Sequence, residues 1–342
     1  MSKLHGLYPA AEPAAMAAPG PARESDGSDR SGGTVVAVDV GATKTVIARY
    51  ADNGIEPFDR FLTPATGEEL SESILRALDR TGLVGGRAEQ VGNGGSGSEI
   101  ISRIGIGAPG PLDAEHGMIL DPPNLPGWRN YPLVETLENQ LRVPIKLEND
   151  ANAGALGEAV FGSGRDYPSV FYLTISTGIG AGLVINGRIF GGYKGMAGEV
   201  HAIDPGTYFG RKTGENVIER ASGPGMVRCA RRRIAAGMDT ALDGETLDTY
   251  TLLTALDADD PVAVETVETA RNAIAGLLVN VLTIVAPSVI VLAGGLCTEN
   301  RWFVDPVRDR VHRWITIPEL REIPIERAAL WDTAVLYGAA VL

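Results

Sequence analysis

A run of carboxylate and amide residues separates an expected strand from an expected helix. The run Glu148-Asn149-Asp150-Ala151-Asn152 directly follows a short apolar segment. A hydroxyl group that attacks a phosphoryl group must lose its proton, and a carboxylate held beside it can accept that proton. Asp150 is the candidate for this base, and the amide of Asn149 can both donate to and accept from a substrate hydroxyl. The alternative is that Asp150 only caps the helix that follows.

Three glycine turns each follow a short apolar run that has the composition of a buried strand. The turns are Asp39-Val40-Gly41-Ala42-Thr43-Lys44, Ser176-Thr177-Gly178-Ile179-Gly180-Ala181-Gly182 and Gly294-Gly295. Glycine lets the backbone approach a ligand closely, so that N–H groups can converge on phosphate oxygens. One such turn is common in proteins, but three in this order predict a nucleotide site.

Polar side chains in these turns suit the same ligand. The hydroxyl groups of Thr43 and Thr177 can donate to phosphate oxygens, and Lys44 can supply a positive charge. Asp39, at the end of its strand, can hold Mg²⁺ through water, because this ion keeps most of its hydration shell. The sequence has no P-loop, and no GxGxxG opens a helix after the first strand, so it favours an actin-like nucleotide site.

Strand-like and helix-like hydrophobic patterns alternate from residue 34 onward. Strands are expected at residues 34–39, 45–50, 58–63, 104–108, 145–147, 170–175, 182–185 and 289–293. Helices are expected at residues 68–78, 133–141, 151–160, 262–285 and 333–341. A hairpin followed by a helix, and a second similar cycle from Val170, predict two related α/β domains with a cleft between them.

The composition is that of a globular protein with an acidic surface. A net charge of −13 over 342 residues disfavours nucleic acids and anionic membranes as partners. Lysine is scarce relative to arginine, which either salt adaptation or a GC-rich genome would produce. Cys229 and Cys297 cannot form a disulfide framework in so long a chain, and without a signal-peptide pattern the cytoplasm is the expected location. Residues 1–33, rich in Ala, Pro, Gly and Ser, are expected to be a disordered tail.

From Val35 to the C-terminus the chain resembles the ROK family of repressors and sugar kinases, and in particular its glucokinases. The resemblance rests on motifs in the family's order: Asp39–Lys44, Gly107–Pro111, Pro123–Trp128, Glu148–Glu158, Ser176–Gly182, Gly195–Glu199 and Gly294-Gly295. The runs Glu-Asn-Asp-Ala-Asn and Ala-Gly-Glu are the most specific of these.

The resemblance implies an α/β protein with two actin-like (ribonuclease H-like) domains and an interdomain nucleotide cleft. The small domain would comprise residues 34–148 and 328–342, the large domain residues 149–327, and the protein would be a homo-oligomer, either a dimer or a tetramer. The implied reaction transfers the γ-phosphoryl group of Mg-ATP to a hexose, most simply glucose, with Asp150 as general base. The sugar would contact Asn124, Asn149, Asp150, Glu199, His201 and Glu219. ATP would be surrounded by Asp39, Gly41, Thr43, Lys44, Thr177, Gly178, Gly294 and Gly295.

Two features depart from the family's pattern. The family has Ala-Gly-Glu-x-Gly-His, whereas here His201 stands only two positions after Glu199, so it either contacts the sugar from a shifted loop or is structural. The family also binds structural zinc through cysteines beyond that histidine. Residues 202–216 contain no cysteine, and because a closed zinc site needs about four ligands, no zinc is expected. Glu219 resembles a further sugar-binding glutamate, with a solvated position on a helix as the alternative.

Three other functions stay open on the sequence alone. A sugar-sensing repressor of the family would carry a DNA-binding domain, but only low-complexity residues precede Thr34 and the chain is acidic. A non-catalytic sugar-binding protein is suggested by the departures above. A kinase for N-acetylmannosamine, N-acetylglucosamine or fructose is the third, because a fold does not fix a substrate.

Overall fold

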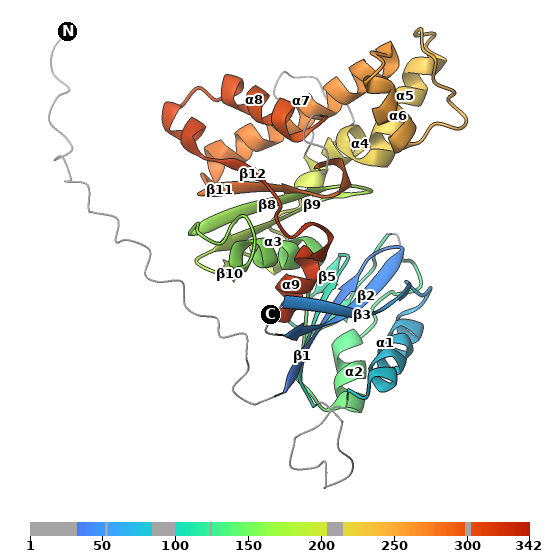
Figure 1. Cartoon of the computed structure of the whole chain (residues 1–342), viewed down its shortest axis with the longest axis vertical. Coiled ribbons are helices and arrows are strands. Elements are labelled where there is room, and N and C mark those ends of the chain that lie inside the picture. Colours follow the sequence, from blue (N-terminus) through green and yellow to red (C-terminus); the bar gives the residue numbers. More distant parts are fainter. Residues whose placement is uncertain (1–32, 52–53, 84–99, 124, 204–214, 298–301) are drawn as a thin grey trace, which may run out of the picture.

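Two five-stranded sheets, stacked with two helices between them, dominate the protein (Figure 1). The computed structural model describes residues 33–51, 54–83, 100–123, 125–203, 215–297 and 302–342. The chain completes the first sheet before it enters the second, and its last helix returns to the first. Apart from Gly33, the predicted N-terminal tail lies outside the described residues.

The first sheet has the strand order β3-β2-β1-β4-β7. Its strands are β1 (Thr34–Val40), β2 (Lys44–Ala51), β3 (Gly54–Leu62), β4 (Ile101–Ala108) and β7 (Ile145–Asn149). β1, β2 and β3 pair antiparallel, whereas β4 and β7 continue the sheet parallel to β1. Strands that are covered on both faces read as continuous apolar runs, and Val35–Val38 of β1 are at most 2% exposed.

The second sheet repeats this arrangement with the order β10-β9-β8-β11-β12. Its strands are β8 (Ser169–Ile175), β9 (Ile179–Ile185), β10 (Arg188–Ile189), β11 (Val289–Ala293) and β12 (Ile325–Arg327). β8 to β10 pair antiparallel, and β11 and β12 lie parallel to β8. The predicted duplication of an α/β unit is therefore confirmed at the level of strand order and direction.

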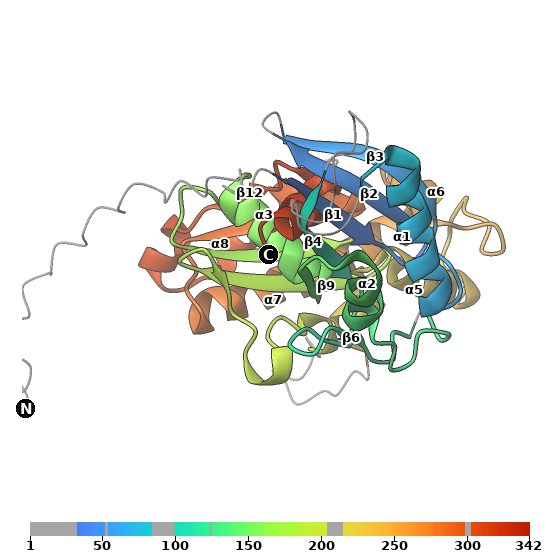
Figure 2. The ribbon, with the colours of Figure 1, turned by 90° about the horizontal axis from the view of Figure 1, so that it is seen from below.

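Helices form the remaining layers of the molecule. They are α1 (Gly67–Thr81), α2 (Leu133–Leu141), α3 (Asp150–Val160), α4 (Val217–Ala221), α5 (Gly223–Ala235), α6 (Thr249–Leu256), α7 (Pro261–Ile284), α8 (Val304–Trp314) and α9 (Ala334–Ala340). Short 3₁₀ turns lie at η1 (Tyr193–Gly195), η2 (Val200–Ala202), η4 (Gly295–Cys297), η5 (Pro318–Glu322) and η6 (Trp331–Thr333), and β5 (Leu112–Asp113) pairs with β6 (Met118–Ile119). α1 and α2 cover the outer face of the first sheet, and α4 to α8 that of the second (Figures 1 and 2).

α3 and α9 fill the space between the two sheets. α9 packs on β1 and β2 of the first sheet, and α3 packs on β8 and β9 of the second. The two helices touch each other through glycine: a Cβ on Gly338 would lie 1.7 Å from the carbonyl oxygen of Ala153, and one on Gly157 would lie 2.2 Å from that of Ala334. Only glycine permits so close an approach of two backbones. This contact joins the two halves of the fold.

α7 is the central helix of the layer that covers the outer face of the second sheet. In the described part of the chain it is the one helix long and apolar enough to meet the length and composition of a membrane span, with half of that window buried. It packs against α4, α5, α6 and α8, and side chains such as Ile274 and Leu278 are fully buried. These contacts are those of a core helix in a globular protein.

The expected strands and helices all occur, with small shifts at their ends. β3 begins four residues earlier than predicted, because its first half completes the hairpin with β2. The short strands β5, β6, β10 and β12 were not predicted, and neither were the helices α4, α5, α6 and α8. Several of them are short, and their apolar faces pack on α7 and on one another rather than on a sheet. Cys229 and Cys297 are both buried and free.

Candidate active site

The carboxyl ends of three parallel strands meet at one edge of the first sheet. Asp39 in β1 pairs with Gly107 in β4, and Gly107 in turn pairs with Glu148 in β7. Neighbouring parallel strands end at the same edge, so the polar residues at their ends are brought together although they are far apart in the sequence. A Cβ on Gly107 would lie 3.8 Å from the Cα of Asp150. The first glycine turn, which begins at Asp39, and the predicted base Asp150 therefore share this edge.

Asn149 and Asp150 divide two tasks at the start of α3. The side-chain oxygen of Asn149 caps the helix by accepting from the N–H groups of Ala151 (2.9 Å) and Asn152 (3.3 Å). Asp150 is the first residue inside the helix, and its Oδ1 accepts from the N–H of Ala151 at 2.8 Å. The residue that caps α3 is thus Asn149 and not Asp150, which was the structural alternative for Asp150.

Burial changes the proton affinity of the Asp150 carboxyl group. Loss of water around it raises its pKa to about 6, and the nearby carboxylate of Glu199 adds to the rise, while hydrogen bonds from the backbone oppose it. A carboxylate with such a pKa is ionised at pH 7 and still accepts a proton more readily than an ordinary aspartate. These are the properties required of a general base.

Glu199 reaches this edge because three backbone segments are packed closely. A Cβ on Gly198 would lie 2.3 Å from the carbonyl oxygen of Ala181 in β9, and one on Gly180 would lie 2.9 Å from the Cβ of Ala151 in α3. β9 thus carries the Gly198–Glu199 turn on one side and the start of α3 on the other. The turn also holds His201, whose Nδ1 lies 3.1 Å from Oε2 of Glu199.

A backbone hydrogen bond closes the first glycine turn, Asp39–Lys44. The N–H of Gly41 donates to the carbonyl oxygen of Lys44 at 2.9 Å, and the hydroxyl of Thr63 donates to the carbonyl oxygen of Gly41 at 2.6 Å. Thr43 and Lys44 are exposed at the tip of the turn. Their side chains are therefore available to a ligand, while the turn itself is held by β2 and β3.

Asp39 carries the most perturbed carboxylate of this edge. Its pKa is raised to about 7, chiefly by burial and also by the carboxylates of Asp150 and Asp332, while the ammonium of Lys44 opposes the rise. Three carboxylates facing one lysine leave an excess of negative charge, which a divalent cation bound to phosphate would neutralise. The residues therefore fit Mg²⁺ held by Asp39 through water. No group of three or more His, Cys, Asp or Glu able to ligate a metal directly occurs among the described residues.

The second and third glycine turns lie together at the carboxyl edge of the second sheet. Thr174 of β8 pairs with Ala293 of β11, so the turns that follow, at Thr177-Gly178 and at Gly294-Gly295, are neighbours. Gly294 has φ 87°, and a Cβ there would lie 2.4 Å from the carbonyl oxygen of Ile175. A Cβ on Gly178 or Gly295 would meet nothing within 4 Å. Packing thus requires glycine at position 294, whereas positions 178 and 295 border open space.

The ROK family profile matches residues 35–342 of this chain. The chain belongs to the ROK family. It is 31% identical over 324 residues to a glucokinase of Streptomyces coelicolor, a match that covers 91% of this chain and 97% of that enzyme. It is also 31% identical over 314 residues to an N-acetyl-D-glucosamine kinase of Pasteurella multocida, covering 89% of this chain and 97% of that enzyme.

A solved structure of the family has the same architecture. The crystal structure of a ROK family glucokinase from Streptomyces griseus, in complex with glucose and AMPPNP, is 28% identical to this chain. The TM-score is 0.69, and the match covers 90% of this chain and 98% of that one. Together with the strand order of the two sheets, this match confirms the predicted actin-like α/β fold.

Two of the predicted sugar-binding residues of this ROK protein are not brought to the edge by any described contact. Asn124 lies outside the described residues. Glu219 forms a capping box at the start of α4: its Oε2 accepts from the N–H of Asn216 at 2.9 Å, and its own N–H donates to the side chain of Asn216. Neither of the two alternatives considered for Glu219 included a cap, and its assignment to the sugar stays a prediction.

Some residues that shape the site were not singled out from the sequence. Asp332 raises the pKa of Asp39 from the turn that precedes α9, and no local motif connects the two. Glu158 ends the Glu-Asn-Asp-Ala-Asn motif and is fully buried, where its carboxylate accepts from the N–H groups of Ser163, Ala329 and Leu330. Its place in the motif was the available signal. It joins the end of α3 to the segment that leads to Asp332.

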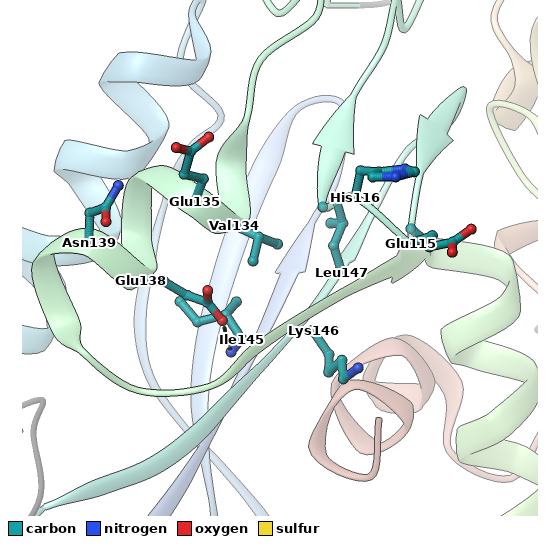
Figure 3. A pocket seen from close by; sticks show the side chains of 11 residues that line it. Glu115, His116, Val134, Glu135, Glu138, Asn139, Ile145, Lys146 and Leu147 are labelled. Atoms are coloured by element: carbon teal, nitrogen blue, oxygen red, sulfur yellow. Dashed lines mark hydrogen bonds between the residues drawn. The ribbon is translucent and has the colours of Figure 1, made fainter.

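A separate cavity of about 350 Å³ lies on the first sheet beside α2 and β7 (Figure 3). Its lining includes Glu115, His116, Glu138 and Lys146. His116 is exposed and pairs with Asp113, with 2.8 Å between Nδ1 and Oδ2. None of the predicted site residues lines this cavity, so it is distinct from the edge that carries Asp39 and Asp150.

Proposed function

We propose that this ROK protein is a sugar kinase that transfers the γ-phosphoryl group of ATP to a hydroxyl of glucose, with Asp150 as the general base. The observation that carries the proposal is the position of Asp150. Its buried carboxylate, with a pKa raised to about 6, stands at the end of β7 beside the turn of Asp39 and faces Glu199 from the other side. The 31% identity to a glucokinase over 91% of the chain supports glucose as the acceptor.

The proton transfer follows from the position of Asp150. As the sugar hydroxyl attacks the phosphorus atom, its proton passes to the free oxygen of the Asp150 carboxylate, since the other oxygen accepts from the N–H of Ala151. The amide of Asn149 is fixed by its capping bonds, which leaves its Nδ2 as a donor toward the same substrate. Orientation of the hydroxyl and removal of its proton are thus tasks of the first turn of α3.

Residues at the carboxyl edges of the two sheets would bind the negatively charged phosphates. Lys44 and the N–H groups of the turn at Gly41 would face the phosphates from the first sheet, and Thr177, Gly178 and Gly295 from the second. Asp39 would hold Mg²⁺ through water, and the bound ion would neutralise part of the phosphate charge. The open space beside Gly178 and Gly295 supports this assignment, because a ligand can enter where no side chain packs.

The sugar side of the site is formed by Glu199 and His201. The carboxylate of Glu199 can accept hydrogen bonds from sugar hydroxyls. Its Oε2 contacts Nδ1 of His201, and this contact orients the carboxylate. The proposal is supported by the turn that carries both residues, with φ 92° at Gly198: the carboxylate of Glu199 is near enough to raise the pKa of Asp150, and His201 lies beside Glu199. His201 therefore acts beside Glu199 despite the shortened spacing between the two residues.

Sugar-dependent release of ADP tests the proposed function. Purified protein with Mg-ATP is assayed with glucose, N-acetylglucosamine, N-acetylmannosamine, fructose and no sugar, at low and at high salt, and the Asp150→Asn variant is the control. We expect ADP release with glucose that the variant lacks. Folded protein that binds ATP but releases no ADP with any of these sugars would overturn the assignment as a kinase and favour a sugar-binding role.

A second candidate acceptor is N-acetylglucosamine. An N-acetyl-D-glucosamine kinase is as similar to this chain as the glucokinase is, at 31% identity over 314 residues. The acetamido group needs space beside the sugar's second carbon, and the panel separates the two sugars by their ratios of kcat/KM.

The remaining predictions about the whole molecule belong to the same proposal. We expect the small domain to comprise residues 34–148 and 328–342 and the large domain residues 149–327, with ATP in the cleft between them. We also expect a homo-oligomer, a cytoplasmic location and no zinc. The joint formed by α3 and α9 supports a hinge at these boundaries, since both helices contact both halves of the fold.

A further inference from the structure

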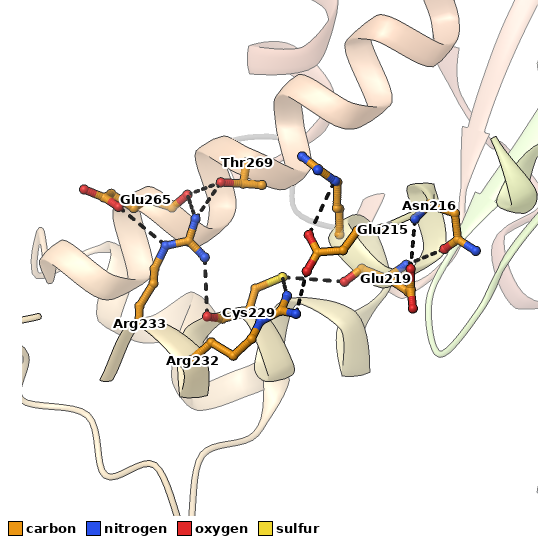
Figure 4. A network of polar contacts seen from close by, with 9 residues as sticks. Glu215, Asn216, Glu219, Cys229, Arg232, Arg233, Glu265 and Thr269 are labelled. Carbon is orange, nitrogen blue, oxygen red and sulfur yellow. Dashed lines mark hydrogen bonds and ion pairs between the residues drawn. The ribbon is translucent and has the colours of Figure 1, made fainter. Parts of the chain in front are cut away.

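A closed ring of polar contacts surrounds the start of α4 (Figure 4). The carboxylate of Glu215 lies 2.5 Å from Nη1 of Arg232 on α5 and 3.7 Å from Nε of Arg220 on α4. The other amino group of Arg232 donates to Sγ of Cys229 at 3.1 Å, and this thiol donates to the carbonyl oxygen of Glu219 at 3.6 Å. The capping box between Glu219 and Asn216 completes the ring.

The ring is anchored to the core of the second half of the protein. Arg233, next to Arg232 on α5, donates to the hydroxyl of Thr269 at 2.8 Å and to the carbonyl oxygen of Glu265, both on α7 (Figure 4). α7 is the most buried of the helices in this layer. Contacts of α5 therefore link the buried helix α7 to the first residues of α4.

The start of α4 is in turn bonded to the segment that carries Glu199 and His201. The N–H of Val217, the first residue of α4, donates to the carbonyl oxygen of Ile203 at 2.9 Å. η2, which contains His201, packs on both α4 and β9. A displacement of the start of α4 would therefore move the segment Glu199–Ile203 relative to Asp150.

Apolar packing contributes to this junction: Val217 is fully buried in the core of the second half, and Ile203 packs against that core. A cavity of about 540 Å³ lies behind the junction and is lined by Ile203, Val217, Arg220, Asn272, Gly276 and Trp314. Hydrophobic contact alone fixes a surface element only where side chains fill the space behind it. On the side of the cavity, the ion pairs and the capping box add to the apolar packing of Val217 and Ile203.

We propose that Glu215 and Arg232 are positioning residues for the sugar: their ion pair holds the start of α4, and through it Glu199 and His201, in register with Asp150. This inference rests on the proposed function, because it assigns Glu199 and His201 to the sugar. Neither Glu215 nor Arg232 touches the reacting groups. Their contribution acts on sugar affinity, while the phosphate turns and the base stay in place.

The variant Arg232→Met tests this role, because Arg232 is half exposed and its loss leaves the hydrophobic core intact. We expect the KM for the sugar to rise roughly two- to fivefold, the range of a partly exposed ion pair, with kcat and the KM for ATP within about twofold of the wild type. Arg232→Lys keeps the positive charge, so its KM for the sugar should lie between those of the wild type and Arg232→Met. Arg228→Met, an exposed arginine on the same helix, is the matched control and should leave all three parameters unchanged.

Amide hydrogen exchange of the segment containing Val217 provides a readout that does not need activity. In Arg232→Met we expect the Val217 amide to exchange roughly tenfold faster than in the wild type, and in Arg228→Met at the wild-type rate. Unchanged exchange would overturn the mechanical link. Faster exchange with an unchanged sugar KM, or an equal change in the KM values of sugar and ATP, would overturn the positioning role. A wild type that phosphorylates no sugar would refute the proposed function instead, and the exchange data would still decide the link.

Discussion

Replacement of Asp150 by asparagine should make this protein inactive and at the same time more stable. The side chain of asparagine keeps an oxygen for the N–H of Ala151, so the first turn of α3 is preserved. It cannot accept the proton of the sugar hydroxyl, and the loss of a general base costs roughly 10²–10⁴-fold in kcat. A steady-state assay of ADP release with saturating glucose and ATP measures this loss.

The gain in stability follows from the raised pKa of Asp150. The folded state binds the proton with a pKa of about 6, whereas an unfolded aspartate has a pKa of about 3.9. Between these two values the folded state holds more protons, so the free energy of unfolding falls as the pH rises from about 4 to about 6 and stays low above that. Although the carboxylate is buried, the residue as a whole retains some solvent exposure, so we reduce the ~3 kcal/mol of a two-unit shift to roughly 1–2 kcal/mol.

Thermal unfolding of wild type and Asp150→Asn at several pH values tests the second half of this prediction. Above pH 6 the variant should melt a few degrees higher, and near pH 4 the two melting temperatures should converge. A variant that retains more than a tenth of the wild-type kcat would refute the role of Asp150 as base. A stability difference that is the same at pH 4 and pH 7.5 would refute the burial of its charge.

The other predictions concern turns, the buried carboxylate and the pH profile. Gly294→Ala should lower the free energy of unfolding by roughly 2 kcal/mol or more, since its Cβ would clash with the backbone of Ile175 and Gly294 has φ 87°. Gly295→Ala should fold normally and raise the KM for ATP, because a Cβ there meets nothing within 4 Å. Melting curves and kinetics that do not distinguish the two variants would contradict the assignment of these turns. Glu158→Gln turns one acceptor oxygen into a donor that faces backbone N–H groups, and it should cost roughly 1–3 kcal/mol by chemical denaturation; an unchanged midpoint would exclude Glu158 as the joint between α3 and the chain before α9. Glu219→Gln preserves an oxygen for the capping box and should keep its stability while the sugar KM rises; a wild-type sugar KM would leave Glu219 as a cap only. In the wild type, kcat/KM should fall about tenfold per pH unit below pH ~6 as Asp150 is protonated, and a pH profile that is flat down to pH 5 would exclude it as the base.

The sequence alone determined the local chemistry of this protein. The glycine turns after apolar strands, the carboxylate in Asp39 and the Glu148–Asn152 run are local patterns, because a turn needs specific residues at fixed spacing and a buried strand needs a continuous apolar run. The resemblance to the ROK family extended these patterns to a function. For the same reason the strands of both sheets, apart from the short β10 and β12, and the long helix α7 were predicted within a few residues of their ends.

Only the tertiary structure decided which of these residues act together. The proximity of Asp39, Asp150 and Glu199 depends on strand pairing and on glycine contacts between α3, α9 and β9. These contacts join residues that are far apart in the sequence, so they leave no local signal. Burial is likewise a property of the folded chain, and it is the largest cause of the raised pKa values of Asp39 and Asp150. Three-dimensional contacts likewise decided that Asn149 caps α3, which leaves Asp150 as the candidate base, and that Glu215 pairs with Arg232.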